Sequence, residues 1–279
     1  MNTTLKSVRF LHSGWCSQFA RLAGEPSWRW VRFYAVFVYF EHPVHGGCLI
    51  DTGYSDQFFQ ATRWLPQRIY RWVTPIVLDE GRDAPNRLRQ AGIDPAGIKQ
   101  VFVSHFHADH VAGLRCFPDV EFIYRMAPFD RLQRQATHTQ VRHGFLSDLI
   151  PADIPARSRP IGEAQFVPGE GDWHEFLVCD YWNDGSLLLI DLPGHADGHL
   201  GFVLQSEDKR VFYIVDACWH VDVMLNQRPL PWISQRFQHD AVGYFDTQQK
   251  LRRLTEQTGI QLLACHCPRT LDYDSSAPH

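Results

Sequence analysis

The chain has 279 residues, a formal net charge of −4, 44% hydrophobic and 21% charged residues. This balance is typical of a globular protein that is long enough to bury a sizeable core. Because there is no surplus of positive charge, the composition argues against a nucleic-acid partner. No linker, repeat or low-complexity segment interrupts the sequence, so we expect one domain.

The N-terminus and the cysteines indicate the compartment. Residues 1–10 lack the long apolar segment and the cleavage pattern of a secretory signal. The longest apolar-rich stretch, residues 31–40, contains Arg32 and is too short to span a bilayer. Seven cysteines, an odd number with scattered spacing, argue against a disulfide framework and for a reducing compartment. We therefore expect a cytoplasmic protein with no membrane partner.

The first half of the chain alternates short apolar runs with helical patterns. In chain order we expect strands at 8–11, 31–40 and 48–50, and then one or two helical pieces within 54–78 that are broken at Pro66. A helix at 84–91 and a strand at 100–103 should follow. Beyond them we expect a helix beginning at 111–114, a strand at 120–124 and a helix at 128–135. Core packing is one expected role of the aromatic residues in the stretch 54–78.

The second half begins with a polar, proline-dotted stretch, residues 137–168, which we expect to form a long loop over one face. Phe145, Leu146, Leu149 and Ile150 within it are candidates for covering an apolar substrate. Beyond it we expect strands at 173–180 and 186–192 joined by a hairpin turn at 183–185, strands at 201–205, 211–215 and 261–265, and a helix at 241–259 that stops at Gly259.

Four potential metal ligands stand together directly after the strand at 100–103. They are His105, His107, Asp109 and His110. Imidazole and carboxylate ligands suit zinc, iron, manganese or cobalt. In extended chain His105 and His107 face the same way, so they can bind one ion, whereas Asp109 and His110 come where the chain turns and can reach a second ion. A histidine-rich loop without metal is the alternative.

This motif resembles the signature of the metallo-β-lactamase superfamily of hydrolases. The remaining family ligands are matched, in the family's order, by His195 in Pro193-Gly194-His195, by Asp216 after a strand and by His266 at a strand end. The resemblance runs from about Val31 to Pro268. It implies an α/β fold, a four-layer αββα sandwich of two β-rich halves, with residues 1–279 forming a single hydrolase domain of this kind.

The resemblance also implies roles for these residues. His105, His107 and His195 hold the first metal, Asp109, His110 and His266 hold the second, and Asp216 bridges both together with a hydroxide that attacks the substrate. Asp109 is in addition a candidate catalytic residue that accepts or relays a proton. Asp51 matches a family aspartate that supports the site without binding metal; a strand-end aspartate that caps a turn is the alternative.

Within the superfamily the sequence is nearest to the N-acyl homoserine lactonases. This resemblance implies that the stretch 54–78 forms a wall of the substrate pocket or a dimer contact, and core packing is the alternative. Those enzymes carry a tyrosine three residues after the bridging aspartate, where this chain has Trp219. An indole N–H only donates and cannot relay a proton. Trp219 and the adjacent His220, with Phe145 and Leu146, are candidate residues of the substrate pocket. Cys265 and Cys267 flank His266 at a strand end, so we expect both to point away from it as structural residues.

We therefore expect a dinuclear metal-dependent hydrolase that opens a lactone or a related ester. Its cofactors would be two divalent ions, zinc or alternatively iron, manganese or cobalt. Its partner would be a small-molecule substrate, and a homodimer is an open alternative. The competing predictions are a thioesterase or phosphodiesterase on the same scaffold, a metal-bound ligand-binding or regulatory protein with little turnover, and an iron-dependent oxygenase.

Overall fold

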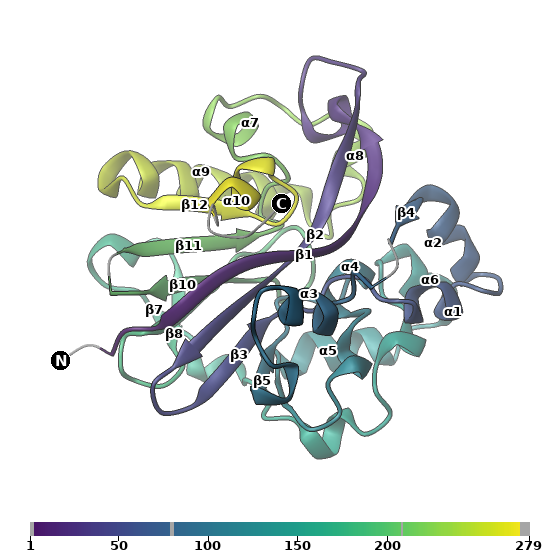
Figure 1. Cartoon of the computed structure of the whole chain (residues 1–279). Helices are drawn as coiled ribbons and strands as arrows, with labels where there is room; N and C mark the ends of the chain where they lie inside the picture. The colour runs from purple at the N-terminus through teal and green to yellow at the C-terminus, as the bar shows by residue number, and fades with distance from the viewer. Residues whose placement is uncertain (1–2, 79–80, 208, 274–279) are drawn as a thin grey trace.

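Two six-stranded sheets form the centre of the computed structural model, which describes residues 3–78, 81–207 and 209–273 (Figure 1). The first sheet has the order β4 (Ile76–Val77), β1 (Lys6–Phe19), β2 (Trp30–His42), β3 (Gly46–Ile50), β5 (Ile98–Phe102) and β6 (Glu121–Ile123). The second has the order β12 (Gln261–Ala264), β11 (Arg210–Val215), β10 (Leu200–Gln205), β9 (Leu187–Asp191), β8 (Leu177–Asp180) and β7 (Val167–Pro168).

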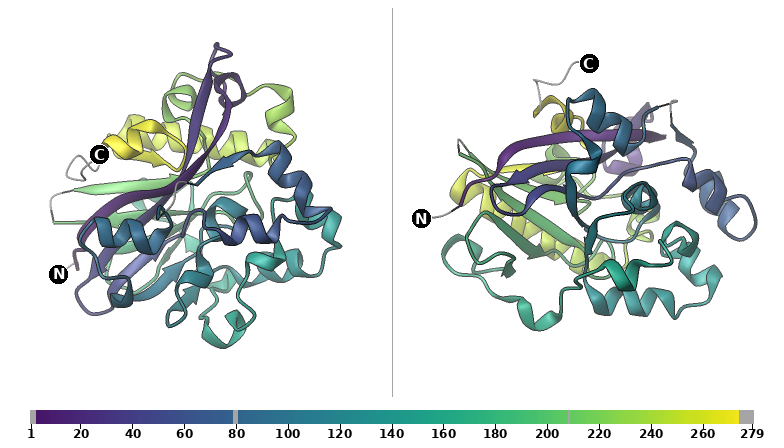
Figure 2. Two further views of the ribbon diagram at one scale, coloured as in Figure 1. Left: turned by 45° about the vertical axis from the view of Figure 1, so that its right-hand side comes forward. Right: turned by 60° about the horizontal axis from the view of Figure 1, so that its bottom comes forward.

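Helices cover the outer face of each sheet, as Figures 1 and 2 show. Those in the first half of the chain are α1 (Gln57–Ala61), α2 (Gln67–Val73), α3 (Ala84–Gln90), α4 (Ala108–Val111), α5 (Met126–Gln133) and α6 (Thr137–Arg142). The second half adds α7 (Val221–Leu225), α8 (Trp232–Gln235), α9 (Ala241–Thr258) and α10 (Pro268–Tyr273). The predicted αββα sandwich is confirmed.

Strand alternation explains how one chain fills three apolar layers. In β2, Val36 and Val38 face the other sheet while Phe37 faces the helices, because successive side chains of a strand point to opposite faces. β11 does the same, since Tyr213 packs between the sheets and Phe212 packs outward. Both faces of these strands are therefore buried, which explains their nearly continuous apolar sequence.

Most predicted strands and helices are confirmed, and four predictions need correction. β1 is much longer than 8–11, because register shifts and Gly14 at a φ of 77° interrupt the alternation that marks a strand. A helix already begins at Ala108, inside the histidine motif, rather than at Val111. The stretch 137–168 contains α6 and several 3-10 turns instead of one loop. The predicted strand at 173–180 begins only at Leu177.

Two further sequence-based expectations concern the whole chain. All seven cysteines lie within the described residues and none forms a disulfide, as predicted. No helix in the described ranges combines the length and apolar character that crossing a bilayer requires.

Phe202 tests the packing between the sheets. Its side chain is fully buried on β10, and its ring centroid lies 6.3 Å from that of Phe102 on β5 of the other sheet. Phe202→Ala should lower the free energy of unfolding by about 3–5 kcal/mol, because it leaves a cavity between the sheets. Urea unfolding measures the change. Val242→Ala on α9, where Val242 is 80% exposed, is the control and should change it by less than about 0.5 kcal/mol. A loss below about 1 kcal/mol for Phe202→Ala would contradict this packing.

Candidate metal centre

All seven predicted ligands lie at one end of the two sheets, in loops that follow strands and in the short helix α4. His105, His107, Asp109 and His110 follow β5, His195 follows β9, Asp216 directly follows β11 and His266 follows β12. Neighbouring parallel strands such as β11 and β12 end at the same sheet edge, so residues far apart in sequence meet there. The structure therefore brings the two halves of the chain together at this edge.

The Asp216 carboxylate lies at the middle of the cluster. Its Oδ2 is surrounded by the Nε2 atoms of His195 at 3.2 Å, His266 at 3.3 Å, His110 at 3.4 Å and His105 at 3.9 Å. This position matches that of a carboxylate shared by two neighbouring cations.

His107 and Asp109 belong to two groups of ligand atoms that share Asp216. His107 Nδ1 lies 3.0 Å from His195 Nε2. Asp109 Oδ2 lies 3.4 Å from His266 Nε2 and 3.5 Å from His110 Nε2. The ligand atoms of His105, His107, His195 and Asp216 all fall within 4.8 Å of one another.

The chemistry of these atoms fits cations. Nε2 of His105, Nε2 of His110 and Oδ1 of Asp216 are buried and have no hydrogen-bond partner among the described residues. Leaving such atoms unpaired away from water costs about 1–3 kcal/mol each or more, which a bound cation would offset. Nitrogen and oxygen donors in this mixture suit zinc and its first-row neighbours.

Hydrogen bonds on the far side of three rings aim their Nε2 atoms at the centre. His110 Nδ1 donates to Asp51 Oδ2 at 2.7 Å, His195 Nδ1 donates to Gln238 Oε1 at 2.9 Å, and His266 Nδ1 donates to the Tyr34 carbonyl oxygen at 2.9 Å. Such partners fix the tautomer and the ring orientation of a metal ligand. Asp51 thus lies at the position from which we expected it to support the ligand cluster without binding metal.

Asp51 is itself held firmly. Its carboxylate accepts from the Ser104 backbone N–H at 2.8 Å and from Ser104 Oγ at 2.7 Å. These bonds tie the end of β3 to the start of the histidine motif.

Sequence reasoning missed two side chains that support the cluster. Gln238 orients His195, and its own Nε2 donates to the Ser234 carbonyl at 3.2 Å. His199 is buried, accepts from the Asp216 backbone N–H at 3.2 Å, and lies 3.1 Å from the Leu192 carbonyl through Nδ1. Neither belongs to a motif, and only the folded chain brings them beside the ligands.

Glycines at two positions let the backbone approach the ligands. Gly144 follows α6 with a φ of 68°, and a Cβ there would lie 2.5 Å from Cδ2 of His107. Gly194 has a φ of 126°, and a Cβ there would lie 2.1 Å from the backbone nitrogen of Tyr244 at the start of α9. Only glycine adopts both the conformation and the close contact.

Charges within the cluster oppose the effect of burial. Burial alone would raise the pKa of Asp216, but His266 and His110 hold that pKa well below its usual range. Burial would likewise lower the pKa of His110, but the carboxylates of Asp109, Asp51 and Asp216 raise it well above its usual range. The lowered pKa values of Asp216 and Asp109 favour their ionised forms, the forms in which carboxylates bind metal, whereas burial raises the pKa of Asp51.

The two cysteines beside His266 were expected to point away from it, and Cys265 differs from this prediction whereas Cys267 does not. Cys265 Sγ falls within 4.8 Å of ligand atoms of His110, Asp216 and His266, so the prediction that it points away from the site is wrong. It also accepts a hydrogen bond from the Val36 backbone N–H at 3.3 Å. Cys267 is buried in the apolar layer under α9, as expected.

The predicted pocket residues divide into two pairs. The Trp219 ring lies 6.4 Å from the His195 ring, beside the cluster, and His220 Nε2 lies 3.6 Å from Glu25 Oε1. Phe145 and Leu146 are each 1% exposed and belong to the core under the first sheet, so their assignment to the pocket is wrong. Leu149 and Ile150 are buried in the same core.

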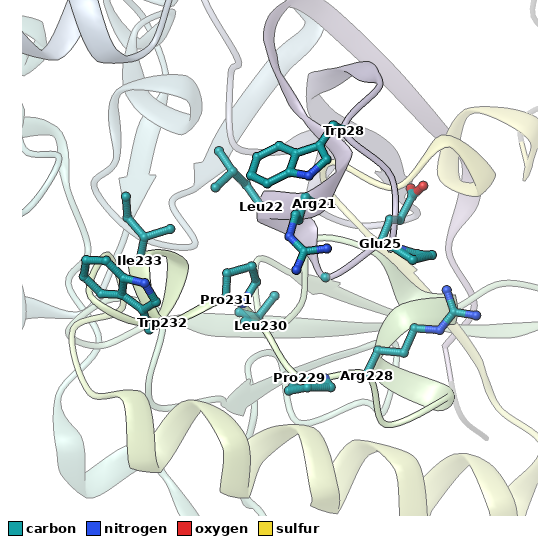
Figure 3. A pocket seen from close by; sticks show the side chains of 12 residues that line it. Arg21, Leu22, Glu25, Trp28, Arg228, Pro229, Leu230, Pro231, Trp232 and Ile233 are labelled. Carbon is teal, nitrogen blue, oxygen red and sulfur yellow. The ribbon is translucent and has the colours of Figure 1, made fainter.

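Two hollows open near this end of the molecule. One of about 120 Å³ has His107 and His195 in its lining. The other, of about 590 Å³, is a groove between the loop that carries Trp28 and the segment 228–233. Figure 3 shows Trp28 and Leu22 on one side of this groove, opposite Pro229, Leu230 and Pro231.

Known proteins resemble both the sequence and the fold. Residues 72–128 match the family described as Anti-Pycsar protein Apyc1. The N-acyl homoserine lactonase AttM of Rhizobium johnstonii is 28% identical over 206 residues, which are 72% of this chain and 70% of that protein.

Solved structures share the fold. Bacillus thuringiensis AiiA with N-decanoyl-L-homoserine bound at its active site has a TM-score of 0.71 at 17% identity, over 97% of this chain and 96% of that one. AidC, a dizinc quorum-quenching lactonase in complex with its product, has a TM-score of 0.66 at 14% identity, over 96% of this chain and 89% of that one. The motif order, the αββα fold and these relatives together support a metal-dependent hydrolase whose sequence is similar to that of the N-acyl homoserine lactonases and whose fold is that of the solved lactonases.

Proposed function

We propose that this protein uses two divalent metal ions to hydrolyse the ring ester of a lactone or a related ester. The observation that carries this proposal is the meeting of five imidazoles and the Asp109 carboxylate around Asp216, with three polar atoms of this cluster buried and unpaired among the described residues. The similarity to named lactonases over 72% of the chain favours a lactone over other esters.

The two groups of ligand atoms would form two metal sites. His105, His107 and His195 would hold one ion, Asp109, His110 and His266 the other, and Asp216 both. Zinc is our first choice of metal because one solved neighbour is described as a dizinc lactonase, and because the donors suit it.

Two such dications, when bound, lower the pKa of a water that they share and polarise the substrate carbonyl. In the overall reaction the water oxygen bonds to the carbonyl carbon and the ring C–O bond breaks. The alkoxide that leaves takes up a proton, and the product is a hydroxy acid.

Asp109 and Trp219 determine how the chain handles that proton. Trp219 stands beside His195 but cannot pass a proton to the alkoxide, since its indole nitrogen has no free lone pair. The Asp109 side chain is 10% exposed, more than that of Asp216 at 2%, so it is the more accessible carboxylate of the cluster. We therefore assign Asp109 the role of accepting the proton from water and delivering it to the leaving oxygen.

Metal-dependent acid release tests this function. Metal-loaded protein should release acid from acyl homoserine lactones or simple aromatic lactones, followed with a pH indicator, and chelator-treated protein should not. A thioester and a phosphodiester measured in parallel test the competing hydrolase activities. Turnover of either of those, with no acid released from any lactone by loaded protein, would overturn the lactone proposal.

Asp109→Asn tests the catalytic carboxylate while keeping the size of the side chain. We expect acid release to fall by at least about 100-fold, the lower end of what a general acid–base group contributes. Asp148→Asn, which changes an exposed carboxylate in the η4 turn (Ser147–Leu149), should leave the rate unchanged. Circular dichroism checks that both variants fold. Full activity of Asp109→Asn would show that Asp109 is neither ligand nor proton acceptor.

Gly144→Ala tests whether His107 needs its close backbone neighbour. The added Cβ would lie 2.5 Å from the ring, so His107 must move and one metal site should weaken by about 10–100-fold in affinity. Gly92→Ala has a similar φ of 77° but meets nothing within 4 Å, and it controls for backbone strain alone. Metal titration followed by calorimetry measures both variants. Equal affinities in the two would contradict the role of His107 as a ligand.

A further inference from the structure

The smaller hollow adjoins the metal ligands and is the most direct place for the part of a substrate that does not react. His107 and His195 line one side of it, and Phe106, Leu132 and Phe237 supply apolar walls. Its volume of about 120 Å³ equals about four water molecules at roughly 30 Å³ each. The hollow therefore fits one compact chemical group.

Two arginines make the rim of this hollow positive. Arg142 is the last residue of α6 and Arg236 follows α8 directly. Both are exposed, and the side chain of neither has an ion-pair or hydrogen-bond partner in the described parts of the chain. The two segments that carry these arginines lie close together here, because the ring centroids of His143 and His239 are 5.8 Å apart.

The one carboxylate of the hollow and one of its two amides are already engaged, whereas Oε1 of the other amide, Gln135, is buried without a partner among the described residues. Asp197 is the one carboxylate among the described residues that line it. Its two oxygens accept from Nε and Nη2 of Arg131, each at 2.7 Å. Gln238 is occupied by His195 and Ser234. The charges of Arg142 and Arg236 thus stay uncompensated within the hollow.

The surroundings of His143 agree with a positive field. Burial, then the neighbouring His239 and Arg142, lower the pKa of His143, because each disfavours another positive charge at this place. An anion in the hollow would oppose this effect.

We propose that this hollow is a binding site for an anionic group of the substrate, a carboxylate or a phosphate, held by Arg142 and Arg236 while the ester lies over the metal ligands. The proposal rests on the proposed hydrolase function and narrows the substrate to esters or lactones that carry a negative charge near the reacting carbonyl. A guanidinium suits this task because it binds such oxygens through two parallel hydrogen bonds and stays charged.

The first arm of the test compares two substrates that differ only in charge. They are a γ-butyrolactone that carries a carboxylate on its ring and the neutral carboxamide of the same lactone. For metal-loaded wild-type protein we expect kcat/KM to be at least about tenfold higher for the carboxylate, as a charge-assisted hydrogen bond would give. Equal values, or a preference for the carboxamide, would overturn the proposal.

Variants test whether the two arginines of the hollow cause the preference for the carboxylate substrate. Arg142→Gln and Arg236→Gln should each lower kcat/KM for the carboxylate by about tenfold, mainly through KM, and leave the carboxamide within about twofold. Arg89→Gln on α3 removes the same charge from an exposed arginine outside the hollow and should change neither substrate. Equal losses for both substrates would mean that the arginines act on folding or on the metals, and would overturn the proposal.

Binding of simple anions separates this proposal from the hydrolase function. Benzoate and phenyl phosphate are titrated into metal-free protein by calorimetry, and the tighter of the two identifies the kind of group. Binding by wild type and its loss in Arg142→Gln/Arg236→Gln would support the site even if no lactone were hydrolysed. Binding that the double variant retains, or no binding of either anion to wild type, would overturn it.

Discussion

Burial of Asp216 among imidazoles is the constraint on which the rest of the site depends. A carboxylate that is 2% exposed and has one oxygen unpaired among the described residues is costly unless positive charge lies close to it. Two of the four imidazole nitrogens that surround Asp216 are also buried without a partner in the described structure, which adds to the cost of burial. A cluster of unpaired donors and acceptors of this kind is stable when cations satisfy its members together, which is why we treat the seven residues as one unit.

The fold positions this unit through short connections at strand ends. β11 and β12 run parallel and deliver Asp216 and His266 side by side, while β5 delivers the histidine motif from the other sheet. A backbone bond joins the halves here, because Leu200 N–H donates to the Ser104 carbonyl at 3.0 Å. Within the second half, His239 N–H donates to the His195 carbonyl at 3.1 Å. The apolar layer between the sheets therefore fixes the distances between ligands that the sequence separates widely.

The ligands and the strands that carry them were predictable because each follows from local pattern. An apolar run that ends in His105 or Asp216 is visible in the sequence, and so is the stop of α9 at Gly259. The side chains that support the ligands were not predictable from the sequence. The hydrogen bond between Gln238 and His195 joins residues 43 positions apart and depends on how α8 packs. The prediction that Phe145 and Leu146 line the pocket was wrong for the same reason. The polar residues around them concealed the helix α6 and the packing of both side chains in the core.

Cys265 shows a limit of the alternation rule. Its side chain should point away from that of His266 in a regular strand, yet β12 ends at Ala264 and the two residues lie in the turn beyond it. There the thiol lies near the cluster while His266 still reaches Asp216.

The positive hollow distinguishes this chain from what its relatives' names suggest. AttM is named for acyl homoserine lactones, whereas two arginines without a side-chain partner beside the metal ligands favour a charged ester. Trp219 in place of a tyrosine is consistent with such a change, because the leaving oxygen then depends on Asp109. Substrate choice would lie in the segments α6 and α8 rather than in the shared strand ends.

The central claim is that the seven residues bind two metal ions, and anomalous diffraction from crystals of zinc-loaded protein tests it most directly. The account predicts two zinc peaks roughly 3.5–4 Å apart, on either side of the Asp216 carboxylate. One peak would be bounded by His105, His107 and His195, and the other by Asp109, His110 and His266. A single peak, or zinc bound elsewhere with Asp216 left unliganded, would contradict it.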